Sequence, residues 1–330
     1  MSKYTEGCID ASKKMIYGYI SGDLPRFGSG FEEYSPFYKS TNEYIKGYVN
    51  LYDMSNYDSA LTVLSSGDHA FNLIHAGIMD IDTFDCNKLT EYYALGLKRA
   101  MILKYTYREY LKVMSAIICD HLSFDEEIEM INDLLPFMDE EYRLYWKSIV
   151  NFAISSQKLN RNKENVLQLL SRFEISMPLY LNSYLNDVES YNLLKARLGK
   201  ANISFACLDA FHLGDDTGKT YDVIMLSNIL DYFSKVYGYG WKYSQLQEYE
   251  SKLLPILKEN GIAFLTYIFK YSKDLTYRPI IQNSSIRLPD IKGEHEEIVP
   301  FSGMNSLGTE QPESAMLVLK KEGDKNASNY

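Results

Sequence analysis

The sequence predicts an α/β fold with a mostly parallel sheet, and two observations support this prediction. The stretch from Leu61 to Asn87, LTVLSSGDHAFNLIHAGIMDIDTFDCN, has the pattern of a strand, a tight turn, a helix and a second strand. Short apolar strand patterns then return after residue 200, at Ile203–Leu208, Tyr221–Leu226 and Ile262–Phe269. Strands that alternate with helices usually form a parallel sheet, so we expect a Rossmann-like domain.

The first βαβ unit places turn residues and an acid at the ends of two strands. The run Leu61–Leu64 is typical of a strand buried on both faces of a sheet. The turn 65–68 follows, and its last residue, Asp68, is suited to cap a helix that begins near His69. A second strand, Ile81–Phe84, stops at Asp85. This arrangement is typical of nucleoside binding, because turn amides approach the ligand and the acid accepts hydrogen bonds from both ribose hydroxyls.

The turn favours one nucleoside cofactor over another. A dinucleotide fingerprint needs three glycines, whereas this turn has Gly67 alone, and Asp68 would repel a phosphate. S-adenosylmethionine carries no phosphate, so we predict that cofactor and disfavour NAD. The alternative is a βαβ unit in which Gly67 serves only the turn and Asp85 is a solvated strand end.

Composition excludes several other functions. The 330 residues are 46% hydrophobic and carry a formal net charge of -10, with no lysine- or arginine-rich run. We therefore expect a globular protein without general nucleic-acid binding. The four cysteines are far apart and the five histidines form no metal-binding pattern, so we predict no metal. We also expect a cytoplasmic protein, because neither a secretion signal nor an apolar run of membrane-spanning length is present. The sequence does not indicate the oligomeric state.

The segment before the first strand contains the run SPFYKSTNEY. Thr41 or Asn42 is suited to cap a helix that continues to Leu51. One interpretation is a helix that covers an edge of the sheet. The other is a lid over the site, in which Tyr38, Thr41 and Asn42 bind the substrate.

We expect four parts along the chain. Residues 1–60 form an N-terminal helical or lid segment. Residues 61–104 and 201–320 form the cofactor-binding domain. Residues 105–200 show helical periodicity and form a helical cap inserted into that domain or, alternatively, a separately folding helical domain. Residues 321–330 form a flexible tail.

Polar residues also follow the later strands. Asp209 ends the strand Ile203–Leu208 and is suited to accept from an adenine amino group, with Ala210 against the ring. Ser227 and Asn228 follow the next strand, where the methionine part or the substrate would lie. A helix at Tyr243–Leu257, a turn at 259–261 and a last strand at Ala315–Leu319 complete the expected elements. The predicted cofactor-binding residues are Ser65, Ser66, Gly67, Asp68, His69, Asp85, Asn87, Asp209, Ala210, Ser227 and Asn228.

Four motifs together resemble a known family: LTVLSSGDHAFNLI, IDTFDCN, YDVIMLSNILDYF and the upstream SPFYKSTNEY. The chain resembles the betaine-lipid synthase type of S-adenosylmethionine-dependent aminocarboxypropyltransferases and their bacterial relatives. The resemblance covers the sheet and the segment before it and is thin across residues 105–200. It implies a class I methyltransferase-like fold, bound S-adenosylmethionine, and transfer of the 3-amino-3-carboxypropyl group with release of methylthioadenosine. The chain departs from the family in lacking an apolar membrane-binding segment, which favours a soluble small-molecule acceptor over diacylglycerol.

Asp231 and Tyr232 follow the fourth strand and are the candidates for a catalytic base. The alternative is that Asp231 caps the next helix and Tyr232 packs within it. Two other functions stay open at this point: methyl transfer from the same cofactor, and non-catalytic binding of it.

Overall fold

The computed structural model describes residues 2–23, 33–157, 159–160, 164–172, 179–216, 218–228, 233, 236–238, 242–268, 296–304 and 310–321. The predicted catalytic residues Asp231 and Tyr232 lie outside these ranges, as does all of the predicted tail 321–330 except Lys321. The chain divides into two compact units. Unit 1 comprises Met1–Asn42, Leu64–Phe71 and Asp85–Lys200, and unit 2 comprises Glu43–Val63, Asn72–Phe84 and Ala201–Tyr330.

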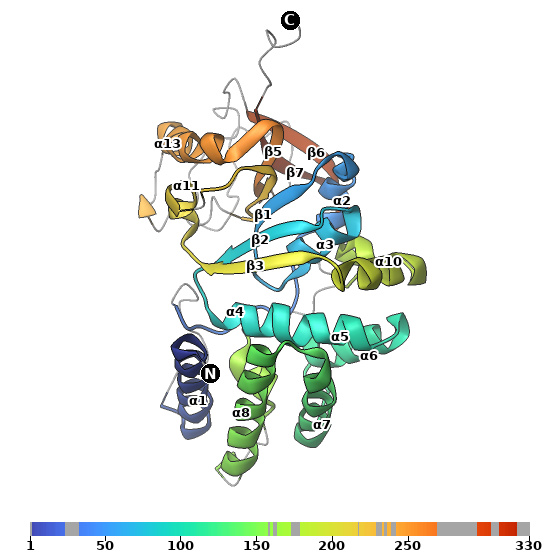
Figure 1. The fold of residues 1–330 in the computed structure, drawn as a ribbon, viewed down its shortest axis with the longest axis vertical. Coiled ribbons are helices and arrows are strands. Elements are labelled where there is room, and N and C mark those ends of the chain that lie inside the picture. The colour runs from blue at the N-terminus through green and yellow to red at the C-terminus, as the bar shows by residue number, and fades with distance from the viewer. Residues whose placement is uncertain are drawn as a thin grey trace, which may run out of the picture. The chain divides into compact units, whose positions relative to one another are not determined.

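Unit 2 is built on a mixed sheet with seven strands among the described residues, in the order β3-β2-β1-β4-β5-β7-β6 (Figure 1). The strands are β1 (Ser59–Val63), β2 (Asp80–Asp85), β3 (Asn202–Cys207), β4 (Tyr221–Met225), β5 (Leu257–Ile268), β6 (Glu296–Met304) and β7 (Glu310–Lys320). Strand β1 pairs in parallel with β2 and β4, and β4 pairs in parallel with β5. Strand β7 is antiparallel to both of its neighbours, β5 and β6. This order, with its single reversed strand inside one edge, is that of the class I methyltransferase-like fold and confirms the predicted α/β class.

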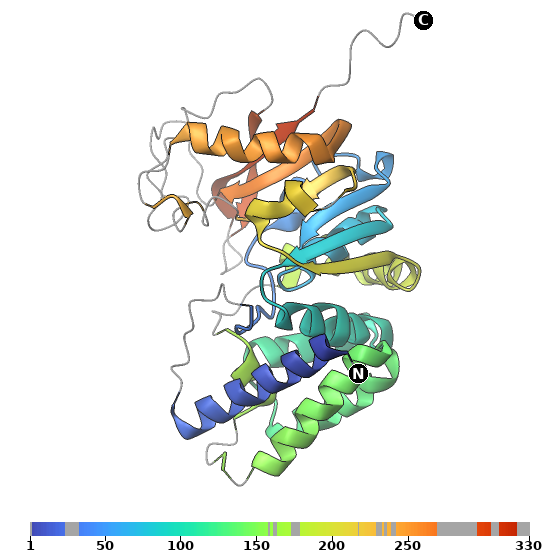
Figure 2. The same cartoon turned by 60° about the vertical axis from the view of Figure 1, so that its left-hand side comes forward.

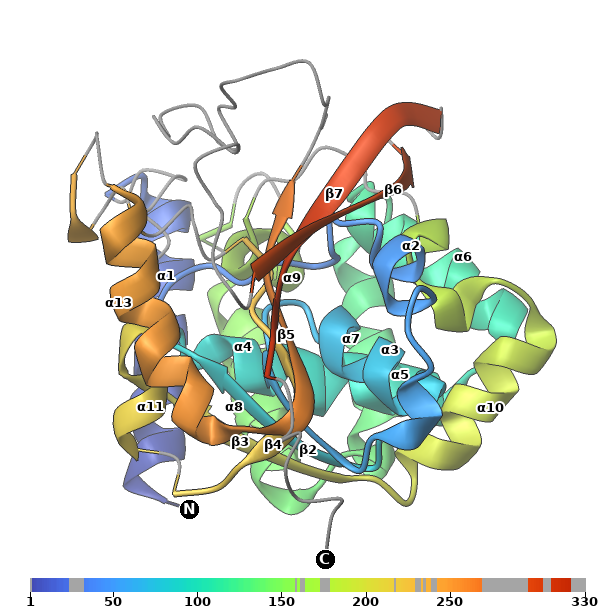
Figure 3. The same cartoon turned by 90° about the horizontal axis from the view of Figure 1, so that it is seen from above.

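The strand β6 was not predicted from the sequence. Its segment, EEIVPFSGM, begins with two acids and contains Pro300, which cannot donate to a strand ladder. The structure places β6 at the edge of the sheet, beside β7 (Figure 3). Proline is tolerated at an edge, since one side of an edge strand needs no partner. Within the described ranges β6 pairs with β7 alone, so tertiary contact and not the local pattern determines this strand.

Apolar side chains from the strands and from α13 (Tyr243–Leu253) form the core of unit 2. Ile224 of β4, Ala263 of β5 and Leu253 of α13 are completely buried in it. The predicted helix Tyr243–Leu257 is four residues too long, because Pro255 lies in a 3₁₀ turn, η7 (Leu254–Ile256), after which β5 begins. The predicted turn at 259–261 lies inside β5, as an irregularity at which Asn260 has φ 61°. The other helices confined to this unit are α2 (Ile45–Val49), α11 (Leu213–Asp216), η1 (Met54–Asn56) and η6 (Ala210–His212).

Unit 1 consists mainly of helices. They are α1 (Lys3–Ser21), α4 (Leu89–Glu91), α5 (Arg99–Lys104), α6 (Tyr107–Ile118), α7 (Phe124–Leu134), α8 (Glu140–Ser156), α9 (Val166–Leu170), α10 (Val188–Leu198), the π-helix η2 (Tyr92–Lys98) and the 3₁₀ turns η3 (Leu135–Phe137), η4 (Leu179–Leu181) and η5 (Ser183–Leu185). Thr106 and Ser123 begin α6 and α7 with capping boxes, so the sequence specifies these two starts locally. Helices α1 and α8 lie side by side (Figure 2), joined by a hydrogen bond of 2.7 Å between Ser12 Oγ and Tyr145 Oη. In α8, the buried Trp146 donates its Nε1–H to the carbonyl oxygen of Tyr92 in the π-helix, at 2.8 Å.

Two expectations about helix starts are wrong. Helix α2 begins at Ile45 after Tyr44, and no side chain caps it, so neither Thr41 nor Asn42 has the predicted capping role. Helix α3 (Asp68–Ala76) already includes Asp68 as its first residue. Thr41 lies four residues before α2, and its backbone N–H donates to Oδ2 of Asp68 at 2.8 Å.

Candidate functional site

The acid at the end of β2 is bonded to the turn that follows β1. Asp85 is the last residue of β2, and its Oδ2 accepts a hydrogen bond of 3.1 Å from the backbone N–H of Ser65. Its Oδ1 accepts from the backbone N–H of Asn87 at 3.0 Å. Burial raises the pKa of Asp85 above its usual value, although these two hydrogen bonds oppose the shift. A carboxylate has about four lone-pair sites in all, so Asp85 retains acceptor capacity for a ribose hydroxyl beside these bonds and the one from the Cys86 side chain.

The turn after β1 has an unusual backbone. Ser65 has φ 45°, in the left-handed region that residues with a Cβ rarely adopt. Gly67 has φ 84°, and a Cβ there would come within 3.0 Å of both Ala94 Cβ and Phe71 Cε2. The single glycine of the turn is therefore required by backbone conformation and by packing within unit 1. Strain in non-glycine residues is most often found at functional sites.

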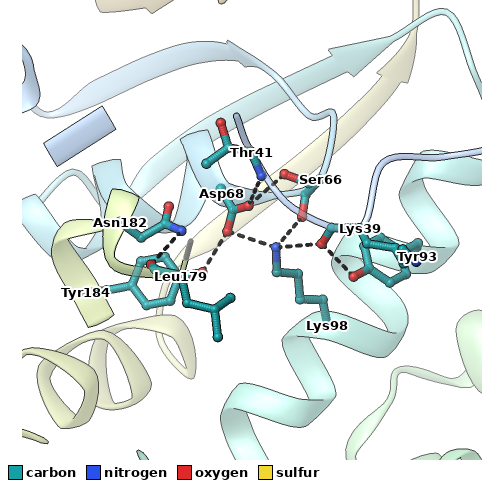
Figure 4. Close-up of polar contacts among 9 residues, drawn as sticks. All are labelled: Lys39, Thr41, Ser66, Asp68, Tyr93, Lys98, Leu179, Asn182 and Tyr184. Atoms are coloured by element: carbon teal, nitrogen blue, oxygen red, sulfur yellow. Dashed lines mark hydrogen bonds and ion pairs between the residues drawn. The ribbon is translucent and has the colours of Figure 1, made fainter. Parts of the chain in front are cut away.

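Asp68 is at the centre of a buried polar network (Figure 4). Its Oδ1 accepts from Lys98 Nζ at 2.8 Å and from the Tyr184 hydroxyl at 2.7 Å. Its Oδ2 accepts from Ser66 Oγ at 2.7 Å and from the backbone N–H of Thr41 at 2.8 Å. Burial disfavours the charged carboxylate, but the charge of Lys98 and these hydrogen bonds outweigh burial and lower the pKa of Asp68. The carboxylate thus joins the turn, the segment around Thr41, the π-helix and the 3₁₀ turn η5.

Lys98 is buried in the same network and binds two carbonyl oxygens as well. Its Nζ donates to Lys39 O at 3.2 Å and to Ser66 O at 3.0 Å (Figure 4). The hydroxyl of Tyr93 also donates to Lys39 O, at 2.7 Å. Lys98 is the last residue of the π-helix, and such helices occur frequently at functional sites. Lys98 and Tyr184 are not predictable from the sequence, because no local pattern relates them to Asp68, which is 30 and 116 residues away.

The remaining predicted residues of unit 1 differ in their exposure. His69 is buried, whereas Asn42 is exposed. Tyr38 is 39% exposed, and the guanidinium of Arg172 lies over its ring at 4.4 Å. Asn87 connects to the upstream segment, since its Nδ2 donates to Ser35 O at 2.9 Å and its Oδ1 accepts from Ser35 N at 3.2 Å. The structure therefore brings Asn87 to Asp85 and Thr41 to Asp68.

In unit 2, the acid after β3 is engaged by its own backbone. Asp209 Oδ1 accepts from the backbone N–H of Phe211 at 3.0 Å and so caps η6, which begins at Ala210. The side chain of Asp209 is exposed, and Ala210 is half-buried. The strand β3, which lies next to β2, ends at Cys207, two residues before Asp209.

The end of β4 holds a buried acid that the sequence analysis did not identify. Glu43 is 1% exposed, and Ser227 Oγ donates to its Oε1. The hydroxyl of Tyr48 donates to Glu43 Oε2 at 3.2 Å. Ser227 has φ 59°, so the residues after β1 and after β4 are both left-handed serines. The amide oxygen of Asn228 is buried and accepts no hydrogen bond within the described part of the chain.

Neither a metal site nor a membrane-spanning helix is found among the described residues. No group of three or more His, Cys, Asp or Glu side chains there could hold a metal ion. No helix there is both long and apolar enough to span a bilayer.

The strand order defines an α/β protein of the class I methyltransferase-like fold. No protein-family model and no curated protein sequence matches the chain. Among solved structures it is similar to the N-methyltransferase NodS from Bradyrhizobium japonicum WM9, with 10% sequence identity, coverage of 82% of this chain and 90% of that chain, and a TM-score of 0.35. It is also similar to the rRNA methyltransferase aviRa from Streptomyces viridochromogenes, with 11% identity, coverage of 79% and 76%, and a TM-score of 0.33. A third similar structure is TehB from Haemophilus influenzae, with 14% identity, coverage of 44% and 53%, and a TM-score of 0.24. The fold assignment rests on the strand order of the sheet.

Proposed function

We propose that this protein is an S-adenosylmethionine-dependent transferase whose cofactor binds at the turn after β1 and the carboxyl end of β2. The observation that carries the proposal is the carboxylate of Asp85. It ends β2, lies against the left-handed turn residue Ser65, and retains lone pairs for a ribose. In open α/β sheets, ligands bind beyond the carboxyl ends of the strands.

The residues of this turn fit a cofactor without phosphate. Asp85 would accept from the ribose hydroxyls, and the network of Asp68 and Lys98 would hold the turn in place. The charge of Asp68 is compensated by Lys98, so the carboxylate that matters here is Asp85, which is a poor partner for a pyrophosphate and is compatible with a cationic sulfonium. When bound, S-adenosylmethionine supplies a carbon that is activated by its bond to the sulfonium. The protein then has to bind the cofactor, align the acceptor with the activated carbon and exclude water.

We propose the 3-amino-3-carboxypropyl group as the group that is transferred, with a small molecule as acceptor and methylthioadenosine as the product. This choice is supported by the sequence resemblance stated above. Methyl transfer, which leaves adenosylhomocysteine, is the alternative, and the strand order is compatible with both reactions. Mass spectrometry of the protein incubated with S-adenosylmethionine and a metabolite extract separates the two, because each reaction leaves a different nucleoside product. Binding of S-adenosylmethionine without release of either nucleoside product would indicate a non-catalytic cofactor-binding protein.

The cofactor site is tested by replacing Asp85 with asparagine. Asp85→Asn keeps the size of the side chain but removes the charge that would face the ribose. Loss of one charge-assisted hydrogen bond, worth about 1.5–3 kcal/mol, predicts about 10- to 150-fold weaker binding of S-adenosylmethionine in calorimetry. Asp82→Asn is the matched control, since Asp82 lies on the same strand and pairs with Lys219 Nζ at 2.9 Å. Equal affinity in wild type and Asp85→Asn would refute the assigned role of Asp85.

A further inference from the structure

Glu43 is a buried carboxylate at the end of β4 that the proposed cofactor site does not use. The residue is 1% exposed, and two hydroxyl groups, from Ser227 and Tyr48, donate to its two oxygens. We propose that Glu43 binds the amino group of the acceptor and takes the proton that this group releases, so that the acceptor is an amine. This inference rests on the proposed transferase function and adds the chemical class of its second substrate.

The position of Glu43 supports a role in the reaction. It bonds to Ser227, the second residue beyond the end of β4, a central strand of the parallel part of the sheet. The carboxyl ends of such strands are where open α/β sheets bind their ligands. Ser227 also has a left-handed backbone, φ 59°, which costs free energy in a residue with a Cβ. In this backbone conformation the Ser227 side chain donates a hydrogen bond to Glu43.

A second acceptor group lies beside this contact. The Oδ1 atom of Asn228 is buried without a hydrogen-bond donor in the described part of the chain. A buried acceptor left unsatisfied is unfavourable, so a ligand that supplies a donor there is stabilised by the hydrogen bond. Glu43 and Asn228 both present oxygens, and an amino group presents several N–H donors. The chemistry of this strand end therefore matches an amine better than a carboxylate or a phosphate.

The Tyr48 hydroxyl that binds Glu43 is held by packing. The Tyr48 ring contacts the rings of Phe264, Tyr267 and Phe301, with centroid distances of 5.6, 6.0 and 5.9 Å. Tyr48 itself is completely buried. A side chain fixed in this way keeps its hydroxyl, and hence the Glu43 carboxylate, in one orientation without cost at the moment of reaction.

The chemistry balances without an oxidant or a reductant. The lone pair of the neutral amine nitrogen forms a bond to the carbon attached to the sulfonium, and the carbon–sulfur bond breaks. Its electron pair stays on sulfur, which leaves as a neutral thioether. The nitrogen becomes positively charged and loses one proton to the Glu43 carboxylate, which passes it to water. The same balance holds for an aminocarboxypropyl group and for a methyl group.

The test uses the full-length protein, S-adenosylmethionine and a small-molecule cell extract separated by cation exchange into a cationic and a non-cationic fraction. Release of methylthioadenosine or adenosylhomocysteine is measured with each fraction. We expect product only with the cationic fraction, and none after its amines have been acetylated. Glu43→Gln should lower this turnover by about 100-fold or more, the usual contribution of a positioned base. Glu43→Asp, which keeps a carboxylate, should recover part of the rate.

Calorimetry with S-adenosylmethionine separates this inference from the proposed function. If the wild type does not bind the cofactor, the proposed function fails and the inference falls with it. If Glu43→Gln binds the cofactor with wild-type affinity but has lost turnover, the inference is supported. Glu250→Gln is the control, because Glu250 is also a buried glutamate of unit 2, 4% exposed, but lies on α13. Product formed from the non-cationic or acetylated fraction, unchanged turnover in Glu43→Gln, or cofactor binding without product from any fraction would each overturn the inference.

Discussion

Replacing Lys98 with methionine removes the cation from the buried network in unit 1. The side chains of Lys98 and Asp68 are each 1% exposed and are joined at 2.8 Å. Methionine fills a similar volume, but Asp68 then keeps a buried charge without a counter-ion, and the carbonyl oxygens of Lys39 and Ser66 lose a donor. Removing one partner of a buried ion pair costs about 3–5 kcal/mol of stability at neutral pH.

The pH dependence of this loss identifies its cause. In the wild type the folded-state pKa of Asp68 is lowered, so its stabilising contribution is present above the unfolded value of 3.8 and is lost as the pH falls through the folded pKa. In Lys98→Met the main opposing effect is gone and burial raises the folded-state pKa of Asp68. The folded variant then holds a proton that the unfolded chain releases, so its stability falls as the pH rises above the unfolded value.

Urea denaturation at about pH 4.5 and about pH 7 measures this effect. We expect the stability difference between wild type and Lys98→Met to be larger at the higher pH. Lys104→Met is the matched control, because Lys104 pairs with Asp133 at 2.7 Å at the surface, with the two side chains 23% and 65% exposed. Such a pair contributes about 0–1 kcal/mol. A loss in Lys98→Met no larger than that of the control, or the same at both pH values, would refute the account of the network.

Two further substitutions test the turn after β1 and a second buried carboxylate. Gly67→Ala introduces a Cβ at φ 84°, within 3.0 Å of Ala94 and Phe71, so we expect a loss of about 1–3 kcal/mol in urea denaturation and weaker cofactor binding; wild-type values for both would contradict the reasoning. Burial and the neighbouring Glu296 raise the pKa of Glu250 to about 10. Above the unfolded pKa of 4.5, the unfolded chain releases a proton that the folded wild type holds, so the wild type loses stability as the pH rises. Glu250→Gln has no such proton, and its advantage over the wild type should grow by up to about 1.4 kcal/mol per pH unit between about pH 5 and pH 8; a constant difference across that range would count against a buried, protonated Glu250.

Local patterns in the sequence were sufficient for the elements of the parallel sheet. The strands β1, β2, β3 and β4 each contain a short apolar run between turn residues, and each lies within two residues of its predicted range. Strands β1 and β4 are largely buried and β3 alternates between exposed and half-buried residues, and the local pattern of each specifies it without reference to distant parts of the chain. The capping boxes at Thr106 and Ser123 likewise specify two helix starts within four residues.

Edge and long-range features could not be predicted in this way. The strand β6 has no strand-like pattern and exists because β7 pairs with it. The cap predicted for Thr41 was wrong because α2 begins only at Ile45, and the contact that the backbone N–H of Thr41 makes is with Asp68, 27 residues away. A local pattern reports on propensity and on neighbours three or four residues away, whereas these contacts depend on how the whole chain folds.

The sequence by itself determined that Asp85 ends a strand after a glycine turn, and that Ser227 and Asn228 end another. Only the tertiary structure decided what these residues touch. It placed Ser65 against Asp85, buried Lys98 beside Asp68, and brought Glu43 to Ser227 across 184 residues of chain. The physical reason is that a strand and its end are set by a few adjacent residues, whereas a buried charge persists only where folding supplies its hydrogen-bond partners.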